Sequence, residues 1–150
     1  MYAFSITSEL NAPPEAVWES VHTLKGVNAE LRPLARMTAP PGMQERTFED
    51  VPVGQTVFCS WIMAFGFIPM DKHCLKLDAV GSYYFRENST SMLQRAWQHH
   101  RTIVRNANAS QLTDDVCFQP RLPLIGRVML PVFKLVFRNR HRYLRQKFNN

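Results

Sequence analysis

Hydrophobic and polar positions follow two different periods, and the period changes three times along the chain. At the start, side chains alternate over residues 2–10, with Tyr2, Phe4 and Ile6 on one side. A period of two over nine residues is typical of a half-buried strand. The sequence therefore predicts a strand over residues 2–10.

The next segment changes to a helical period. The run Asn-Ala-Pro-Pro at 11–14 indicates a helix start, because proline is tolerated in a first turn. Apolar residues at 16, 17, 21 and 24 continue the spacing, and Gly26 is expected to end the helix. A second short helix is expected around 27–34, stopping before Pro33.

The middle of the chain returns to a strand pattern. Strand-forming runs are expected at 56–65, 73–80, 82–87, 92–104 and 110–118. Turn-forming residues separate them at 52–54, 66–71, 81, 88–89 and 106–108. Consecutive strands joined by tight turns predict an antiparallel meander.

The C-terminal region has the pattern of a long amphipathic helix. Its apolar stripe is Ile125, Met129, Val132, Phe133, Val136, Phe137 and Leu144. The opposite stripe is Arg127, Lys134, Arg138, Arg142 and Arg145. Pro131 is expected to kink or restart the helix, since it lacks an N–H. The apolar stretch 122–137 is interrupted by charges and is too short to span a bilayer.

Composition agrees with one globular domain over residues 1–150. The chain has 45% hydrophobic and 20% charged residues, with no internal repeat and no Gly/Ser linker. These values exclude a disordered chain. The N-terminus has no basic region followed by a long apolar run, so no signal peptide is expected.

The three cysteines, Cys59, Cys74 and Cys117, are widely spaced and form no CxxC motif. Neither a zinc site nor a disulfide framework is expected from this spacing. A sparse, odd number of cysteines predicts reduced thiols and a cytoplasmic protein.

Positive charge is concentrated at the C-terminal end. Residues 1–120 hold 10 Lys/Arg and 12 Asp/Glu, whereas residues 121–150 hold eight Lys/Arg and no acidic residue. This segment is a solvated helix face or a surface for transient contact with an anionic membrane. It lacks interleaved aromatic residues and any helix-turn-helix or zinc pattern, so nucleic-acid binding is not expected.

Several local motifs together resemble a known superfamily. They are Ala12-Pro13 through Trp18, Glu30-Leu-x-Pro33, Gly54, Ser60-Trp61, Ile68-Pro69-x-Asp71, Trp97-x-His99-x-Arg101, Leu112-Thr113-Asp114 and Arg140-His141-Arg142. With the order of elements, they resemble the START/Bet v 1-like (SRPBCC) superfamily, in its bacterial ligand-binding or polyketide cyclase-like branch. The resemblance implies an α+β helix-grip fold, in which a curved antiparallel sheet wraps around the last helix. It also implies a cavity between sheet and helix for an apolar small molecule. The functions in this superfamily range from lipid carriage to polyketide cyclisation, so the fold alone does not determine the activity.

One strand pattern carries candidate chemistry. Alternation places Trp97, His99 and Arg101 on one face. A four-residue turn at 105–108 would bring His99 opposite Asp114, with Arg101 diagonal to the same carboxylate. A histidine held by a carboxylate is a possible general base. The alternative is a structural cluster that satisfies buried polar groups, which we favour because no serine, cysteine or metal ligand lies beside it.

A second polar pair is expected nearby. Glu87 shares a face with Tyr83 and Phe85, and a turn at 88–91 would bring it near Arg95. This pair either lines a pocket or forms a salt bridge. The apolar residues expected to contact a ligand are Trp61, Leu75, Phe85, Trp97, Phe133 and Phe137.

Two main hypotheses of function follow. The first is a protein that binds a lipid, polyketide or aromatic metabolite between sheet and helix. The second is a cyclase- or hydratase-like enzyme whose catalytic candidates are His99, Asp114, Arg101 and Glu87. A weaker third is an interaction module that uses the basic helix. No pair of histidines has metal-site spacing, and no cofactor motif is present, so neither metal nor cofactor is expected.

Overall fold

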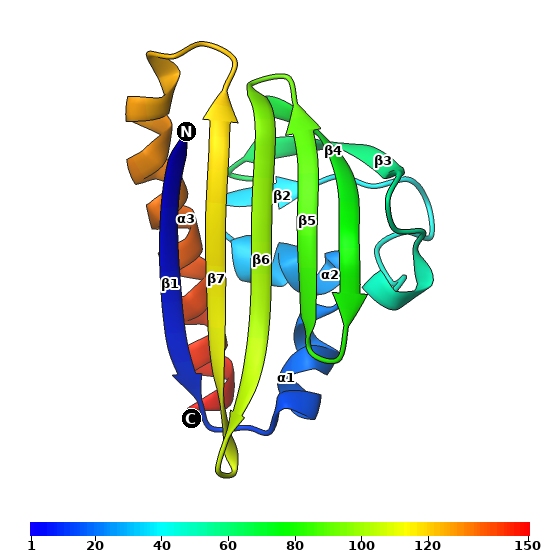
Figure 1. Ribbon diagram of the computed structural model, residues 1–150, viewed down its shortest axis with the longest axis vertical. Coiled ribbons are helices and arrows are strands. Elements are labelled where there is room, and N and C mark those ends of the chain that lie inside the picture. Colours follow the sequence, from blue (N-terminus) through cyan, green and yellow to red (C-terminus); the bar gives the residue numbers. More distant parts are fainter.

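The computed structural model describes residues 1–150 as one antiparallel sheet with its helices on one face (Figure 1). The seven strands are arranged in the order β1-β7-β6-β5-β4-β3-β2. Their bounds are Tyr2–Leu10 (β1), Ala35–Met37 (β2), Thr56–Ala64 (β3), Ile68–Gly81 (β4), Tyr84–Ser91 (β5), Gln94–Asn106 (β6) and Ala109–Pro120 (β7). The order confirms the predicted meander and adds the short strand β2.

Three α-helices and one short 3-10 helix complete the fold. They are α1 (Pro14–Val21), α2 (Leu24–Leu31), η1 (Phe48–Asp50) and α3 (Ile125–Phe148). All three α-helices lie behind the sheet in Figure 1, with α3 running beside β1 and β7. The predicted α+β helix-grip fold is confirmed.

The first helical region divides earlier than expected. Instead of ending at Gly26, the first helix ends at Val21, and Gly26 lies inside α2. Thr23 begins the second helix, because its hydroxyl accepts a hydrogen bond from the Gly26 N–H (3.0 Å). A Cβ at Gly26 would collide with the carbonyl oxygen of Ser20, so glycine permits this close approach.

Two predicted turns are wrong. Asn88 and Ser89 lie within β5, and the chain turns at residues 92–93 instead. Ser89 is buried and satisfied inside the sheet, since its hydroxyl donates to Glu87 (2.6 Å) and accepts from the Lys76 N–H (3.0 Å). The expected turn at 66–71 is shorter, because β4 begins at Ile68.

The cysteine expectation is also wrong for two of the three residues. Cys59 of β3 and Cys74 of β4 are register partners and form a disulfide. Sequence separation alone does not show this pairing, because the strand register decides which residues face one another. Cys117 is free.

Helix α3 is continuous through Pro131 and does not restart there. Its pattern of burial departs from the predicted stripes. Val132 was expected to face the core but is half-exposed, whereas Arg140 and His141 are buried. No helix of the fold combines the length and the apolar character needed to cross a membrane.

Two apolar clusters form the core. The larger joins α1, α2 and one end of the sheet, and includes Leu10, Val17 and Phe85. The smaller consists of Val116, Phe118 and Phe137, against which Trp97 and Phe133 pack. His99 lies between the two clusters, with its ring centroid 5.2 Å from that of Phe85 and 5.1 Å from that of Phe137.

Candidate functional site

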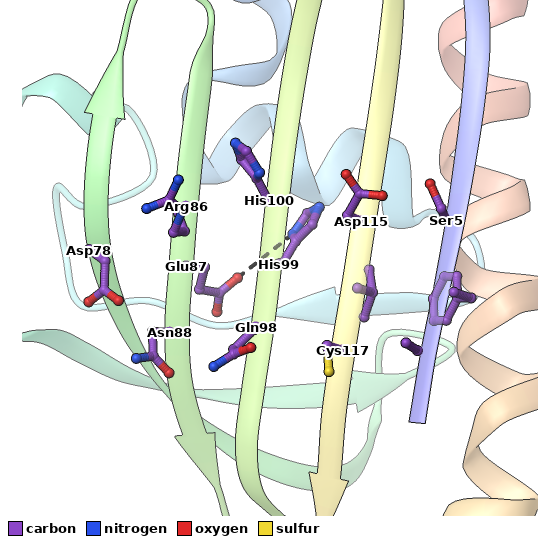
Figure 2. A pocket seen from close by; sticks show the side chains of 13 residues that line it. Ser5, Asp78, Arg86, Glu87, Asn88, Gln98, His99, His100, Asp115 and Cys117 are labelled. Atoms are coloured by element: carbon purple, nitrogen blue, oxygen red, sulfur yellow. Dashed lines mark ion pairs between the residues drawn. The ribbon is translucent and has the colours of Figure 1, made fainter. Parts of the chain in front are cut away.

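A hollow of about 570 Å³ lies on the outer face of the sheet (Figure 2). Its lining is mainly polar and includes Arg86, Gln98, His100 and Asp115. Burial and the neighbouring Arg86 guanidinium lower the pKa of His100. Successive strand residues point to opposite faces, but the lining also includes Glu87 and His99 of the predicted cluster, whose side chains point to the inner face.

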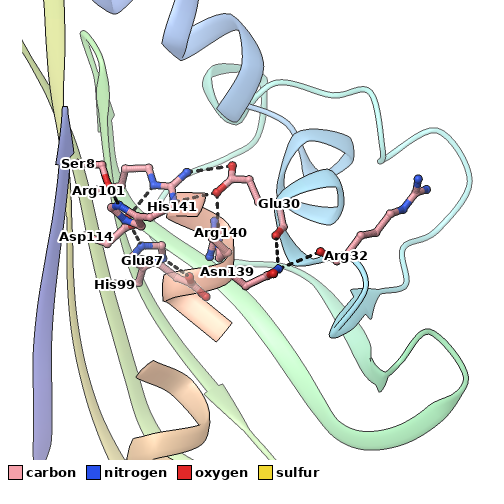
Figure 3. Close-up of polar contacts among 10 residues, drawn as sticks. All are labelled: Ser8, Glu30, Arg32, Glu87, His99, Arg101, Asp114, Asn139, Arg140 and His141. Carbon is pink, nitrogen blue, oxygen red and sulfur yellow. Dashed lines mark hydrogen bonds and ion pairs between the residues drawn. The ribbon is translucent and has the colours of Figure 1, made fainter. Parts of the chain in front are cut away.

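The inner face carries a buried polar network centred on Asp114 (Figure 3). This carboxylate is fully buried. Arg101 Nε donates to its Oδ1 and Arg101 Nη2 to its Oδ2, each at 2.7 Å. His99 Nε2 lies 2.7 Å from Oδ1, and His141 Nε2 lies 2.8 Å from Oδ2. Four hydrogen bonds therefore engage both carboxylate oxygens.

The network continues from the sheet into α2 and α3. Glu30 of α2 accepts from Arg101 Nη1 (3.0 Å) and from Arg140 Nε (3.0 Å). His141 Nδ1 lies 2.7 Å from the hydroxyl of Ser8 in β1, and that hydroxyl accepts from Arg145 (2.8 Å). These contacts clamp the C-terminal half of α3 against the sheet.

A second buried carboxylate, that of Glu87, lies next to this network and pairs with His73. Glu87 Oε2 is 2.5 Å from His73 Nε2, and Glu87 Oε1 is 3.8 Å from His99 Nδ1. Burial alone lowers the pKa of His73, but the charge and hydrogen bond of Glu87 outweigh it and raise that pKa. For Glu87 burial raises the pKa, yet His73 outweighs it and the net pKa is lowered. We therefore describe His73 and Glu87 as a buried ion pair.

At Asp114, too, a neighbouring positive charge outweighs the effect of burial on the pKa. Burial raises the pKa of this carboxyl, but the adjacent Arg101 guanidinium reverses the effect and holds the pKa well below its usual range. The buried carboxylates of Glu30, Glu87 and Asp114 are paired with the buried guanidiniums of Arg101 and Arg140 and with His73. This pairing of opposite charges makes their burial tolerable.

The predicted His99–Asp114–Arg101 cluster forms, but in a different register. Arg101 is the direct partner of Asp114, and His99 is the diagonal one. The β6–β7 connection has two residues, 107 and 108, instead of four. Ala107 adopts a φ of 56°, which such a tight turn requires. A shift of two residues preserves the face of each side chain, so the cluster survives.

The expected Glu87–Arg95 pair does not form. Glu87 pairs with His99 across β5 and β6. A register irregularity between Gln94 and Ala96 reverses the alternation at the start of β6, so Gln94 is buried and Arg95 is exposed.

The six apolar ligand candidates separate into three groups. Trp97, Phe133 and Phe137 meet beneath α3, with the Trp97 centroid 5.0 Å from Phe133 and 6.3 Å from Phe137. Phe85 is deeply buried in the larger core cluster, and Leu75 is partly buried at its edge. Trp61 lies on the outer face beneath Lys72, so it does not line the space between sheet and helix.

Sequence reasoning missed Glu30, Gln94, Arg140 and His141 as inner-face residues. Glu30 and Arg140 come from two helices whose meeting depends on the tertiary fold. His141 lies between two arginines in the sequence, yet the spacing 137–141–144 on α3 places it on the same side as Phe137 and Leu144. That spacing was the available signal.

Comparisons with known proteins agree with this geometry. Residues 8–148 match the family described as "Domain of unknown function (DUF8410)". The chain belongs to this family. A search of curated proteins returns no match.

Solved structures of low sequence identity share the fold of this DUF8410 protein. DynU16, from the dynemicin biosynthetic locus, is 20% identical with a TM-score of 0.60, over 97% of this chain but 48% of DynU16. A START superfamily protein from Mycobacterium smegmatis is 10% identical with a TM-score of 0.68, over 99% of this chain and 98% of that one. Ara h 8.0201 is 13% identical with a TM-score of 0.61, over 95% and 97% of the two chains. The fold is therefore START/Bet v 1-like (SRPBCC), and the chain spans about half the length of DynU16.

Proposed function

We propose that this protein binds an apolar small molecule between the inner face of the sheet and the N-terminal half of α3, residues 125–136. Trp97 and Phe133 form the aromatic wall of the site, and Leu75 lies at its opposite side. Phe85 and Phe137 form its closed end, next to the polar network.

The uneven burial of inward-facing apolar side chains carries this proposal. Near the C-terminal half of α3, Phe137 and Leu144 are almost completely buried. Toward the N-terminal half, Trp97 and Phe133 face the same interior but are only partly buried, and Leu75 is partly buried at the edge of the larger cluster. Apolar side chains that face inward and retain contact with solvent gain stability when a ligand covers them.

The structure offers less support for the cyclase- or hydratase-like alternative. His99, Asp114, Arg101 and Glu87 do point to the inner face, as that hypothesis requires. However, Asp114 and Arg101 are saturated by hydrogen bonds within the chain. A general acid or base has to reach the substrate, so this saturation supports the ligand-binding proposal over the catalytic one.

Binding of Nile red, a neutral apolar dye, tests the proposal. We expect its fluorescence to rise on binding and its affinity to fall at least about tenfold in Leu75→Trp, which narrows the site. Val104→Trp is the matched control, since Val104 is an exposed apolar residue on β6 and lies outside the site. Circular dichroism and melting temperature show that each variant is folded.

Two outcomes would overturn the proposal. One is no dye binding together with no thermal stabilisation by a library of fatty acids and aromatic compounds. The other is equal dye affinity in Leu75→Trp and wild type, which would move binding away from this interior. Native mass spectrometry of protein purified from its own cells adds the mass of a resident ligand.

A further inference from the structure

Two polar groups at the proposed site lack a full set of partners within the chain. Gln94 is only 2% exposed, and its side-chain carbonyl oxygen makes no hydrogen bond. Its amide nitrogen donates to the thioether sulfur of Met129 (2.9 Å), which is a weak acceptor. A buried amide in this state costs stability unless something else binds it.

His73 supplies the second group. Its Nε2 is held by Glu87, while its Nδ1 makes no hydrogen bond within the chain. The ion pair with Glu87 raises the pKa of His73 and favours the imidazolium. Nδ1–H is then an unused donor.

These two groups lie close to each other and to the aromatic wall. His73 is the register partner of Ser91, and the Ser91 hydroxyl accepts from the Gln94 backbone N–H (2.9 Å). The His73 ring meets Trp97 edge to face, with centroids 6.2 Å apart. The His73 donor thus lies beside Trp97, and Gln94 is linked to the same end of the apolar site through Ser91 and through Met129, which packs against the same cluster as Trp97.

We propose that His73 and Gln94 form a polar subsite for a hydroxyl group on the apolar ligand, such as an alcohol or a phenol. A hydroxyl oxygen accepts from His73 Nδ1–H while its O–H donates to the Gln94 carbonyl. This assignment rests on the proposed ligand-binding function and narrows its ligand class.

A pair of biphenyls that differ only at the hydroxyl tests the subsite. We expect wild type to bind 4-phenylphenol at least about tenfold more tightly than 4-methoxybiphenyl, which lacks the donor. Gln94→Leu should reduce that preference to about twofold or less and should also raise the melting temperature, because it removes an unpartnered polar group. Gln98→Leu, an exposed position on the outer face of the same strand, should change neither.

The outcomes separate the two proposals. Failure to bind either compound counts against the ligand-binding function itself. If wild type binds 4-phenylphenol and 4-methoxybiphenyl equally well, the ligand-binding function is supported and the polar subsite is overturned. A Gln94→Leu protein that melts at a lower temperature and keeps the preference also overturns it, because the amide would then be structural.

A different observation concerns the outer side of α3. Exposed apolar residues form a rim along its N-terminal half and the adjoining loops: Met92, Leu122, Leu124, Val128, Val132 and Leu135. Leu124 and Val128 are 80% and 67% exposed, and their spacing continues one helical stripe through Val132 and Leu135. In Figure 1 the β5–β6 turn and the β7–α3 loop lie at the same end of the molecule. Arg121 joins them by donating to the Ser91 carbonyl (3.0 Å).

The charges around this rim have one sign. Arg121, Arg127 and Arg138 are exposed beside it, and residues 121–150 contain no acidic residue. The nearest acid of the adjoining β4 strand, Asp71, is buried and accepts from the Leu93 N–H (3.1 Å). A helix face that combines exposed apolar side chains with flanking arginines is complementary to an anionic lipid surface.

We infer that the rim docks on anionic membranes, independently of whether the interior holds a ligand. The apolar side chains enter the headgroup region while the arginines face the lipid phosphates. Each basic residue near such a surface strengthens partitioning by about fivefold.

Vesicle co-sedimentation tests this surface. Wild type should pellet with phosphatidylcholine vesicles containing about 30% phosphatidylserine, and at least fivefold less with pure phosphatidylcholine or in about 0.5 M NaCl. Leu124→Ser/Val128→Ser should lose at least about tenfold in binding. Val53→Ser/Val104→Ser removes two exposed valines outside the rim and should bind like wild type.

The docking proposal is overturned if wild type does not bind the anionic vesicles, or if the rim variant binds them as well as wild type does. Analytical ultracentrifugation tests whether the rim instead binds a second copy of the chain. Self-association that the rim variant abolishes, without vesicle binding, would assign the rim to a second copy of the chain and also overturn the membrane proposal.

Discussion

The two halves of α3 differ in how they contact the rest of the protein. The C-terminal half, residues 137–148, buries Phe137, Arg140, His141 and Leu144 and forms hydrogen bonds to α2, β1 and β7. In the N-terminal half, residues 125–136, only Gly126 is buried, and Met129 accepts a single side-chain hydrogen bond. One half is clamped and the other rests on partly buried aromatic side chains. A helix fixed at one end can admit a ligand at the other without losing the fold.

The largest expected effect comes from breaking the clamp at its centre. Asp114→Asn leaves Arg101 buried without its main counter-charge and should cost about 3–5 kcal/mol of unfolding free energy. Chemical denaturation measures this loss, and hydrogen exchange should show reduced protection in residues 137–148. Asp115→Asn, the exposed neighbour on the outer face, is the control and should change stability by less than about 0.5 kcal/mol. A stable Asp114→Asn protein would show that the clamp does not hold α3.

Matched phenylalanines sharpen the comparison of the two halves. Phe137→Ala should cost about 3–5 kcal/mol, because it removes an almost fully buried ring. Phe133→Ala should cost roughly 1–2 kcal/mol, since part of that ring is already in contact with solvent. Both values come from denaturation under the same conditions. Equal losses would contradict the difference in packing between the halves.

The smallest effect is a pH dependence at the His73–Glu87 pair. The raised pKa of His73 stabilises the fold below the ordinary histidine value of 6.5, and this contribution is lost as the pH rises through the raised folded pKa. The lowered pKa of Glu87 stabilises the fold above the ordinary value of 4.5, and its contribution is lost as the pH falls through the lowered folded pKa. The pair should therefore stabilise most between these two ordinary values.

Denaturation at about pH 6 and about pH 9 tests this pair. Wild type should lose stability at the higher pH, and Glu87→Gln should show a smaller dependence because His73 no longer has a counter-charge. Titration of the His73 ring by NMR identifies the group. An unchanged pH dependence in Glu87→Gln would assign the loss to other groups.

Local pattern was sufficient for several features of the fold. Alternation over residues 2–10 and the apolar spacing of α3 depend only on neighbouring residues, so β1 and the long helix follow from sequence. The His99–Arg101–Asp114 cluster followed as well, even though the turn was predicted two residues too long. Because side chains alternate with a period of two, that error left all three on one face.

Tertiary structure decided the rest, because it depends on which segments meet. Glu30 and Arg140 join the network only when α2 and α3 pack on the same face of the sheet. A register irregularity, invisible in the pattern, turns Gln94 inward and Arg95 outward. The burial of Val132 depends on how much of α3 the sheet covers. The apolar pattern of a helix shows which of its faces is hydrophobic, but it does not show how far along the helix the sheet extends. The sequence by itself therefore determined the elements and the faces of their side chains, whereas only the packing of distant segments decided which faces are clamped, open to a ligand or left exposed.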